Sequence, residues 1–124
     1  MRTFIRTSLI LASTALLAGA GPASPPRSTY YGNLYDGEQG QLDLTLYAGN
    51  EYQYDGVCDV NCNDLDFVLY RWNGTRWIWA AEDKAMDDVP TVVAAPRRTG
   101  VYRLVIIMAG CGASGRCRYE VDVY

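Results

Sequence analysis

Histidine is absent from this chain of 124 residues. Because histidine is the usual general base near neutral pH and the commonest metal ligand, its absence excludes catalytic triads and histidine metal sites. Positive charge is scarce as well, with 11 Lys and Arg against 14 Asp and Glu and a formal net charge of -3. Binding to nucleic acid needs a basic face, so we expect no nucleic-acid partner.

Long hydrophobic runs are also missing. The apolar segment Ser8–Leu17 is too short to span a bilayer, which takes about 20 apolar residues. It follows Arg2 and Arg6 and precedes the small residues Ala18–Ala20, an order typical of a secretory signal peptide. We therefore predict that residues 1–20 are a signal peptide and that the chain is secreted or periplasmic, with no transmembrane segment after cleavage.

Proline is concentrated near the start of the predicted mature chain, since three of the five prolines lie in Gly21–Thr29. A Pro-rich segment of this kind forms an extended tether and contributes little to a core. The whole chain is 49% hydrophobic and 20% charged, which is an ordinary globular composition. We predict a tether over residues 21–29 and a single folded domain over residues 30–124.

Helical periodicity is missing after residue 30, and short segments alternate between apolar and polar residues instead. In Gln41–Tyr47, three leucines alternate with polar residues, as in a strand with one buried face. The dipeptide Asn73-Gly74 is a strong signal for a β-hairpin. These patterns predict an all-β, antiparallel β-sandwich of about seven to eight short strands. The segments expected as strands are Gln41–Tyr47, Glu51–Val57, Leu65–Tyr70, Arg76–Ala81, Pro90–Ala95, Val101–Ala109 and Arg118–Tyr124.

All four cysteines lie in the predicted exported domain, where an even number favours disulfides. We favour the two local pairs, Cys58–Cys62 and Cys111–Cys117, each closing its own short loop, which contributes roughly 2 kcal/mol in the chain-entropy model. The crossed pairings would stabilise more but require the two loops to be neighbours in space. A zinc site fits less well, because the spacing differs from C-x2-C and histidine is absent.

Candidate nucleophiles find little support in the sequence. Ser24, Ser28 and Ser114 lie in tether or loop segments, and Lys84 is the single lysine. With histidine absent and the cysteines paired, none of them has a recognisable base nearby. Paired carboxylates can hydrolyse glycosides, but they arise easily by chance in a chain this acidic. We predict that the protein is not an enzyme.

Several motifs together resemble a known family. The central one, Cys58–Tyr70, reads CDVNCNDLDFVLY and is similar to the pattern CD-x-x-C-x-DLD-hydrophobic-LY. The others are L-x-x-G-x-x-Y at Leu46, Gly49 and Tyr52, D-x-P-x-hydrophobic within Asp87–Val92, sG-x-Y-x-hydrophobic-x-V at Thr99–Val105, and a closing C…C-x-Y-x-V at Cys111, Cys117 and Tyr119. In order and spacing these motifs resemble the bacterial pre-peptidase C-terminal domain family, in a cysteine-bearing, stand-alone copy. The resemblance covers about residues 40–124.

This resemblance implies a jelly-roll-like β-sandwich. Domains of the family usually lie at the end of secreted bacterial hydrolases as non-catalytic accessory modules, and some relatives bind calcium or insoluble polymers. From the length of this chain we expect no catalytic domain, and we therefore do not expect the hydrolase role to carry over. A stand-alone copy is expected to bind a ligand, to act as a partner subunit, or to be structural.

Acidic and amide side chains gather around the first cysteine loop. Asp59, Asn61 and Asn63 have the D-x-N-x-N spacing of a calcium loop, and Asp64 and Asp66 add carboxylates. Because calcium takes six to eight oxygen ligands, these five are candidate ligands. An EF-hand is not expected, since Asp64 occupies the glycine position and the flanks are strands. The alternative is an Asx-rich turn whose side chains bond to their own backbone. A second acidic group, either a further source of ligands or a solvated loop, is Glu82, Asp83, Asp87 and Asp88.

The three tryptophans form the second candidate site. Trp77 and Trp79 lie on one face of a predicted strand, with Ile78 on the other, and Trp72 precedes the Asn73-Gly74 turn. If that face is exposed, the rings form a flat platform for sugars or other polymers. The alternative is that they pack in the core or cover its rim.

We therefore predict a secreted, non-catalytic binding or accessory domain with a polysaccharide or protein as ligand, acting through the tryptophan face or the loop ends. The alternatives are a calcium-stabilised structural envelope protein and an inhibitor of a secreted hydrolase. Calcium is the one candidate cofactor, and we expect a monomer.

Overall fold

The computed structural model describes residues 25–112 and 114–124, and this part of the chain forms strands and no helix. The predicted signal peptide, residues 1–20, lies outside the described residues, as does the tether up to residue 24. Within the described ranges, no helix is long and apolar enough to cross a membrane. The strands are β1 (Ser28–Leu34), β2 (Gln39–Leu46), β3 (Tyr52–Cys58), β4 (Cys62–Trp72), β5 (Trp77–Asp83), β6 (Thr91–Ala94), β7 (Gly100–Cys111) and β8 (Cys117–Val123).

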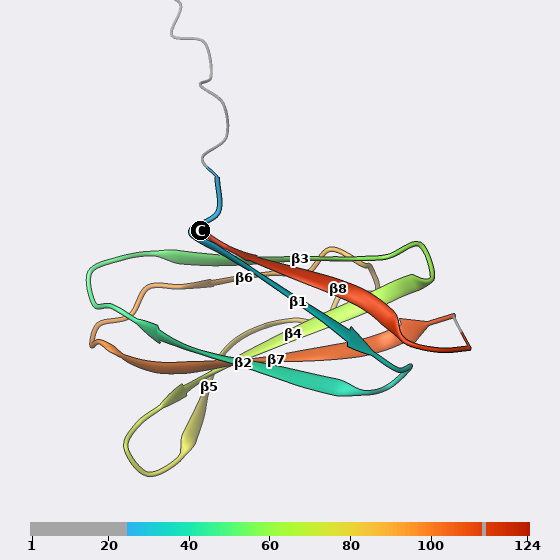
Figure 1. Ribbon diagram of the computed structural model, residues 1–124. Helices are drawn as coiled ribbons and strands as arrows, with labels where there is room; N and C mark the ends of the chain where they lie inside the picture. Colours follow the sequence, from blue (N-terminus) through green and yellow to red (C-terminus); the bar gives the residue numbers. More distant parts are fainter. Residues whose placement is uncertain (1–24, 113) are drawn as a thin grey trace, which may run out of the picture.

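The strands form two four-stranded antiparallel sheets, ordered β1-β8-β3-β6 and β2-β7-β4-β5. Successive strands alternate between the sheets, except that β4 and β5 form a hairpin within one sheet. This arrangement is that of the eight-stranded jelly roll and confirms the predicted all-β, jelly-roll-like sandwich. Figure 1 shows the two layers nearly edge-on, with the β4–β5 hairpin projecting beyond the body.

Alternating side chains from both sheets fill the space between the layers. The central strand β4 places Leu65, Phe67 and Leu69 in the core, all fully buried, as the alternation in the sequence predicted. Strand β7 contributes Leu104 and Ile106 from the same sheet. The residues between them point to the opposite side of the sheet, because successive side chains of a strand alternate. That outer face carries the candidate site described below.

Strand β1 was not predicted, and it starts at Ser28, inside the segment expected to be a tether. Its sequence, STYYGNL, lacks the leucine alternation that marks the other strands. Backbone pairing positions it instead, since every residue from Ser28 to Leu34 faces a residue of β8. Leu34 is the one buried residue of β1, while Tyr30 packs against the core. The folded domain therefore begins before residue 30.

The other strands are confirmed, with some longer than predicted. Strand β7 extends to Cys111 because β4 pairs with it as far as Cys62, which faces Cys111. The predicted hairpin joins β4 to β5 through a loop of residues 73–76. Asn73 fixes this loop: its Oδ1 accepts hydrogen bonds from the backbone N–H of Thr75 and Arg76, both at 2.9 Å. Gly74 has φ 100°, which only glycine adopts readily.

The two predicted disulfides are confirmed. Cys58–Cys62 joins the end of β3 to the start of β4, and Cys111–Cys117 joins the end of β7 to the start of β8. Each bridge therefore ties one sheet to the other. Cys62 and Cys111 also face each other across β4 and β7, so the two loops are neighbours. The two loops are therefore close enough for a crossed pairing, and the local pairs form nevertheless.

Candidate functional site

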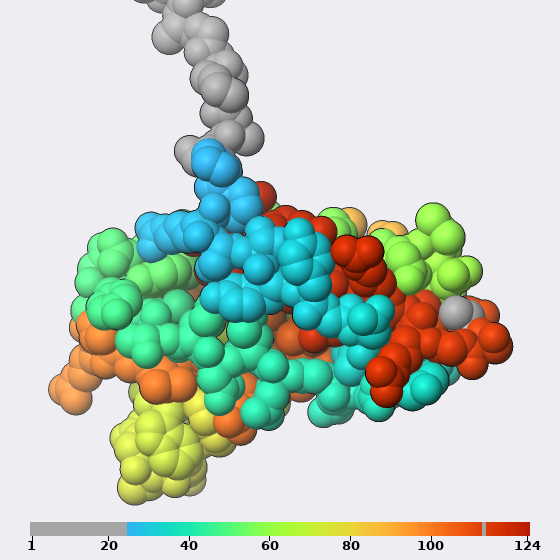
Figure 2. All heavy atoms as spheres, viewed as in Figure 1, coloured from blue at the N-terminus to red at the C-terminus, as the bar shows by residue number. Residues whose placement is uncertain are grey.

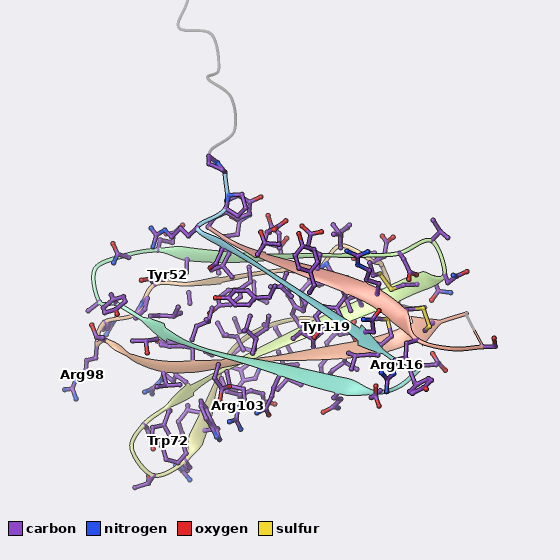
Figure 3. All side chains as sticks on the ribbon, in the orientation of Figure 1. Tyr52, Trp72, Arg98, Arg103, Arg116 and Tyr119 are labelled. Carbon is purple, nitrogen blue, oxygen red and sulfur yellow. A yellow bond between two sulfur atoms is a disulfide. The ribbon has the colours of Figure 1, made fainter. Side chains whose placement is uncertain are left out.

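The tryptophans lie on the outer face of the β2-β7-β4-β5 sheet, on its edge hairpin. Trp72 faces Trp77 across the hairpin, and Tyr70 faces Trp79. Tyr70 and Trp72 alternate with the core residues of β4, so their side chains point away from the core. Figure 3 shows Trp72 and Arg103 on this outward side. Because Trp77 and Trp79 face these two outward residues of β4, they share one face of the strand, as predicted.

This aromatic face is open to solvent. The exposed fraction is 41% for Trp72 and 56% for Trp79, while Trp77 is half-buried. None of the three belongs to the core cluster, so the alternative of core packing is wrong. Large exposed aromatic side chains that lie together are typical of binding surfaces.

The platform is not flat. The ring centroids of Trp72 and Trp77 lie 5.1 Å apart with an interplanar angle of 55°. This is the tilted arrangement that the charge distribution of aromatic rings favours. The two rings therefore form an angled pair, and Trp79 presents the most exposed of the three rings. The expectation of a planar stacking surface is corrected accordingly.

Arg103, on β7, lies over the ring of Trp77, and Asp43, on β2, binds Arg103. The Arg103 guanidinium lies 4.2 Å from the centroid of the Trp77 ring. Its Nε and Nη2 donate hydrogen bonds to the two carboxylate oxygens of Asp43, both at 2.8 Å. This bidentate bond holds the pKa of Asp43 below its usual range, so the pair persists into mildly acidic solution. Sequence reasoning missed both residues. They are far apart in the chain and face each other only through the register in which β2 pairs with β7.

A groove borders the aromatic face at the end of the sandwich opposite the disulfides. Its volume is about 640 Å³. It lies between the end of β4 and the loop that joins β6 to β7, and the orange loop and yellow hairpin project separately in Figure 2. Trp72 belongs both to the groove and to the tilted pair. The groove is lined by Arg71, Trp72, Asn73, Ala95, Pro96, Arg97, Arg98, Thr99, Gly100 and Tyr102.

The predicted calcium loop divides into two parts. Asp59 bonds to the backbone, as its Oδ1 accepts from the Asn61 N–H at 3.1 Å and its Oδ2 from the Arg118 N–H at 2.8 Å. This is the Asx-turn alternative for Asp59. Asn63 lies instead over Gly110, where its Oδ1 takes the space of a Cβ. The structure thus uses these side chains to close the β3–β4 turn against β7 and β8.

Asp64 and Asp66 form the second part, at the start of β4. The Oδ1 atoms of both carboxylates are buried without a hydrogen-bond partner in the described residues. Burial, and next the Asp64 carboxylate, raise the pKa of Asp66 to about 6. The Asp87 carbonyl accepts a hydrogen bond from the Leu65 N–H at 2.9 Å, so the second acidic loop adjoins this pair. Residues 25–112 and 114–124 nevertheless contain no group of three or more Asp, Glu, His or Cys placed to hold a metal ion.

The chain matches no family model and no curated protein. Among solved structures it is similar to the pre-peptidase C-terminal domain of collagenase from Bacillus anthracis, with 16% identity, a TM-score of 0.58, and coverage of 78% of this chain and 88% of that one. The Yersinia pseudotuberculosis-derived mitogen is similar at 17% identity and a TM-score of 0.53, covering 79% and 85%.

A third structure, titled "CBM4 structure and function", has 16% identity and a TM-score of 0.43, covering 77% of this chain and 71% of that one. At these identities the first two likenesses show the fold alone. They agree with the predicted resemblance at the level of the sandwich, because one of them is a pre-peptidase C-terminal domain.

Proposed function

We propose that the protein is a secreted, non-catalytic module that binds a polysaccharide through the aromatic face of the β2-β7-β4-β5 sheet. One observation carries this proposal: Trp72, Trp77 and Trp79 lie together outside the core on one edge hairpin. Trp72 and Trp79 are among the exposed large hydrophobic side chains of the described residues. Aromatic rings in this position cover the apolar faces of sugar rings, and their N–H groups bond to hydroxyls.

Other features support the non-catalytic and secreted parts of the proposal. The chain has no histidine, and the structure pairs all four cysteines, leaving no thiol nucleophile. Disulfides persist in oxidising compartments outside the cytosol, as the predicted signal peptide requires. The similar pre-peptidase C-terminal domain from Bacillus anthracis is named as part of a collagenase, which is in keeping with an accessory role.

The experiment is a binding panel with matched variants. The protein is mixed with insoluble cellulose, chitin and xylan and run in gels that contain soluble polysaccharides. We expect binding to at least one polymer and at least tenfold weaker binding for Trp79→Ala. Tyr31→Ala is the control, because Tyr31 is 60% exposed on β1 of the other sheet. Equal binding by Trp79→Ala and the parent protein, or no binding to any polymer, would reject the proposal.

A calcium-stabilised structural protein is the second candidate, and the unpartnered oxygens of Asp64 and Asp66 favour it. A cation between these carboxylates would relieve their repulsion. The test is a thermal melt in millimolar calcium and again in EDTA. At a hundredfold excess over the dissociation constant, binding adds about 2.7 kcal/mol, a shift of several degrees that Asp64→Asn would abolish. The inhibitor alternative stays a prediction, tested by protease and glycosidase assays.

A further inference from the structure

Four arginines at the groove end lack an ionic or aromatic partner among the described residues. Arg71, Arg76, Arg97 and Arg98 make no ion pair or stacking contact with an aromatic ring in the part of the chain that the structure describes. Every other basic residue described there has such a contact. Those residues are Arg27 on Tyr52, Lys84 with Glu82, Arg103 with Asp43 and Trp77, Arg116 on Tyr35, and Arg118 on Tyr31.

The fold brings the unpartnered arginines together from two elements. Arg71, at the end of β4, and Arg97 and Arg98, in the β6–β7 loop, line the groove of about 640 Å³. Arg76 closes the adjacent hairpin loop, where its backbone N–H donates a hydrogen bond to Oδ1 of Asn73 at 2.9 Å. In Figure 3 Arg98 lies at one end of the molecule, while Arg116 and the disulfides lie at the other.

The β6–β7 loop is fixed at its base. Thr99 Oγ1 accepts a hydrogen bond from the Ala48 N–H at 3.0 Å, and the Pro96 carbonyl accepts one from the Gly49 N–H at 3.3 Å. Pro96 is buried, whereas Arg97 and Arg98 between these anchors are exposed. The loop therefore presents both guanidinium groups from a held backbone, which lowers the entropic cost of binding.

Unpaired arginines in one groove complement a negatively charged ligand. The guanidinium group is planar, always charged and weakly hydrated, and it matches a carboxylate in a bidentate fork. The chain as a whole is acidic, with a formal net charge of -3. The arginines are thus a local exception. Negative charge elsewhere opposes double-stranded nucleic acid, whose charge density requires an extended basic face.

Trp72 indicates the chemical class of the ligand. Trp72 lines the groove together with Arg71, and its ring also belongs to the aromatic face. A ligand that occupies both surfaces must offer flat apolar faces and anionic groups in alternation along one chain. A polysaccharide of uronic acids has this composition, and a volume of this size holds a short stretch of it.

We propose that the groove between β4 and the β6–β7 loop binds an acidic polysaccharide, with Arg71, Arg97 and Arg98 pairing with its carboxylates while Trp72 contacts its sugar rings. The inference rests on the proposed function and names the substrate class of the same site. One ligand chain then occupies both the groove and the aromatic face. It runs along the edge of the sheet from the β6–β7 loop to Trp79.

The test uses the purified protein in affinity gels and calorimetry with polygalacturonate and alginate. The neutral probe is fully methyl-esterified polygalacturonate, which keeps the sugar backbone and removes its charge. We expect binding to a polyuronate that weakens at least tenfold after methyl esterification, and that also weakens between 50 and 500 mM salt. In the variant R97Q/R98Q binding is at least about tenfold weaker, whereas R116Q/R118Q removes the same charge at the other end and binds as the parent does.

The outcomes separate the two proposals. Binding to the methyl ester as tight as to the free polyuronate, unchanged in R97Q/R98Q, would overturn the acidic ligand while leaving polysaccharide binding in place. Binding to none of the polysaccharides of either panel would overturn both. Binding to poly-L-glutamate or to oligo-dT as tight as to the polyuronates would show a general polyanion site and overturn the polysaccharide class.

Discussion

The guanidinium of Arg103 lies over the ring of Trp77, 4.2 Å from its centroid. Asp43 fixes that guanidinium by two hydrogen bonds, so residues of β2 and β7 take part in placing an aromatic ring of β5, on the other side of β4. The contact connects the central strand β7 to the edge hairpin that carries all three tryptophans. The aromatic face is therefore held by the sheet behind it, and its binding should depend on residues that do not touch the ligand.

Asp43→Asn tests this positioning role. Losing the charge loosens Arg103 and with it Trp77, so we expect polysaccharide binding to weaken a few-fold. Stability should fall by less than about 1 kcal/mol, because the pair is exposed. Binding gels and urea denaturation measure the two effects separately. Asp43→Glu keeps the charge and should restore part of the binding; an unchanged affinity in Asp43→Asn would mean that Trp77 needs no such support.

Gly56→Ala tests the packing between the sheets. A Cβ at Gly56 in β3 would lie 2.5 Å from Cζ of Phe67 and 2.9 Å from Cγ of Pro90. Both neighbours are fully buried, so neither can move away freely. We expect a loss of about 1–3 kcal/mol in the free energy of unfolding, measured by urea denaturation. Gly100→Ala is the matched control, since nothing lies within 4 Å of its Cβ position; equal losses in both variants would contradict the packing described.

Asp66→Asn tests the buried carboxylate pair. The pKa of Asp66 is raised to about 6 in the folded protein, above the value of about 3.9 for an unfolded aspartate. Between these values the folded state binds more protons, so stability is greatest at the acidic end and falls as the pH rises from about 4 to about 6. The slope for one proton is at most about 1.4 kcal/mol per pH unit.

We expect Asp66→Asn to flatten this pH dependence and to be more stable than the parent at pH 7, as measured by thermal melts across pH 4–7. Asp88→Asn removes the same charge from an exposed position and should keep the parent's profile. A profile in Asp66→Asn that still falls over pH 4–6 would assign the titration to another group.

The disulfide variants test the closed end of the sandwich. Replacing Cys58 and Cys62 by alanine, or Cys111 and Cys117, should each cost about 2 kcal/mol, because the closed loops are short. Since Cys62 and Cys111 are cross-strand neighbours, the fourfold variant should deviate from the sum of the two. Urea denaturation gives the three values. Binding at the far end should persist in either double variant, and its loss would show that the groove depends on the bridged end.

The leucines of β2 and the apolar residues of β4 and β7 made the sandwich predictable. The alternation of apolar and polar residues in a strand indicates which of its faces is buried. Strand β1 was missed because its position depends on pairing with β8, ninety residues later in the chain. The local disulfides were predicted because each pair of cysteines is close in sequence. The tryptophan face was predicted from the spacing of Trp77 and Trp79, but its tilt depends on the ring of Trp72 across the hairpin.

The groove could not be predicted from any single segment of the sequence, because its lining residues come from two separate segments. Arg71 and the pair Arg97-Arg98 are far apart in sequence and meet only because β6–β7 crosses between the sheets. The one available signal was the doubled arginine Arg97-Arg98 in an otherwise acidic chain. The predicted calcium loop shows that a spacing typical of metal ligands also occurs in side chains, such as Asp59, that close a turn.

The central claim is that the aromatic face binds the ligand, and the indole N–H signals of the three tryptophans test it most directly. They are followed by two-dimensional NMR during titration with galacturonate, cellulose and chitin hexasaccharides. The account predicts that a binding hexasaccharide shifts the signals of Trp72 and Trp79 most, together with backbone signals of the β6–β7 loop. Shifts confined to the β1-β8-β3-β6 sheet, or no shift with any hexasaccharide, would contradict it.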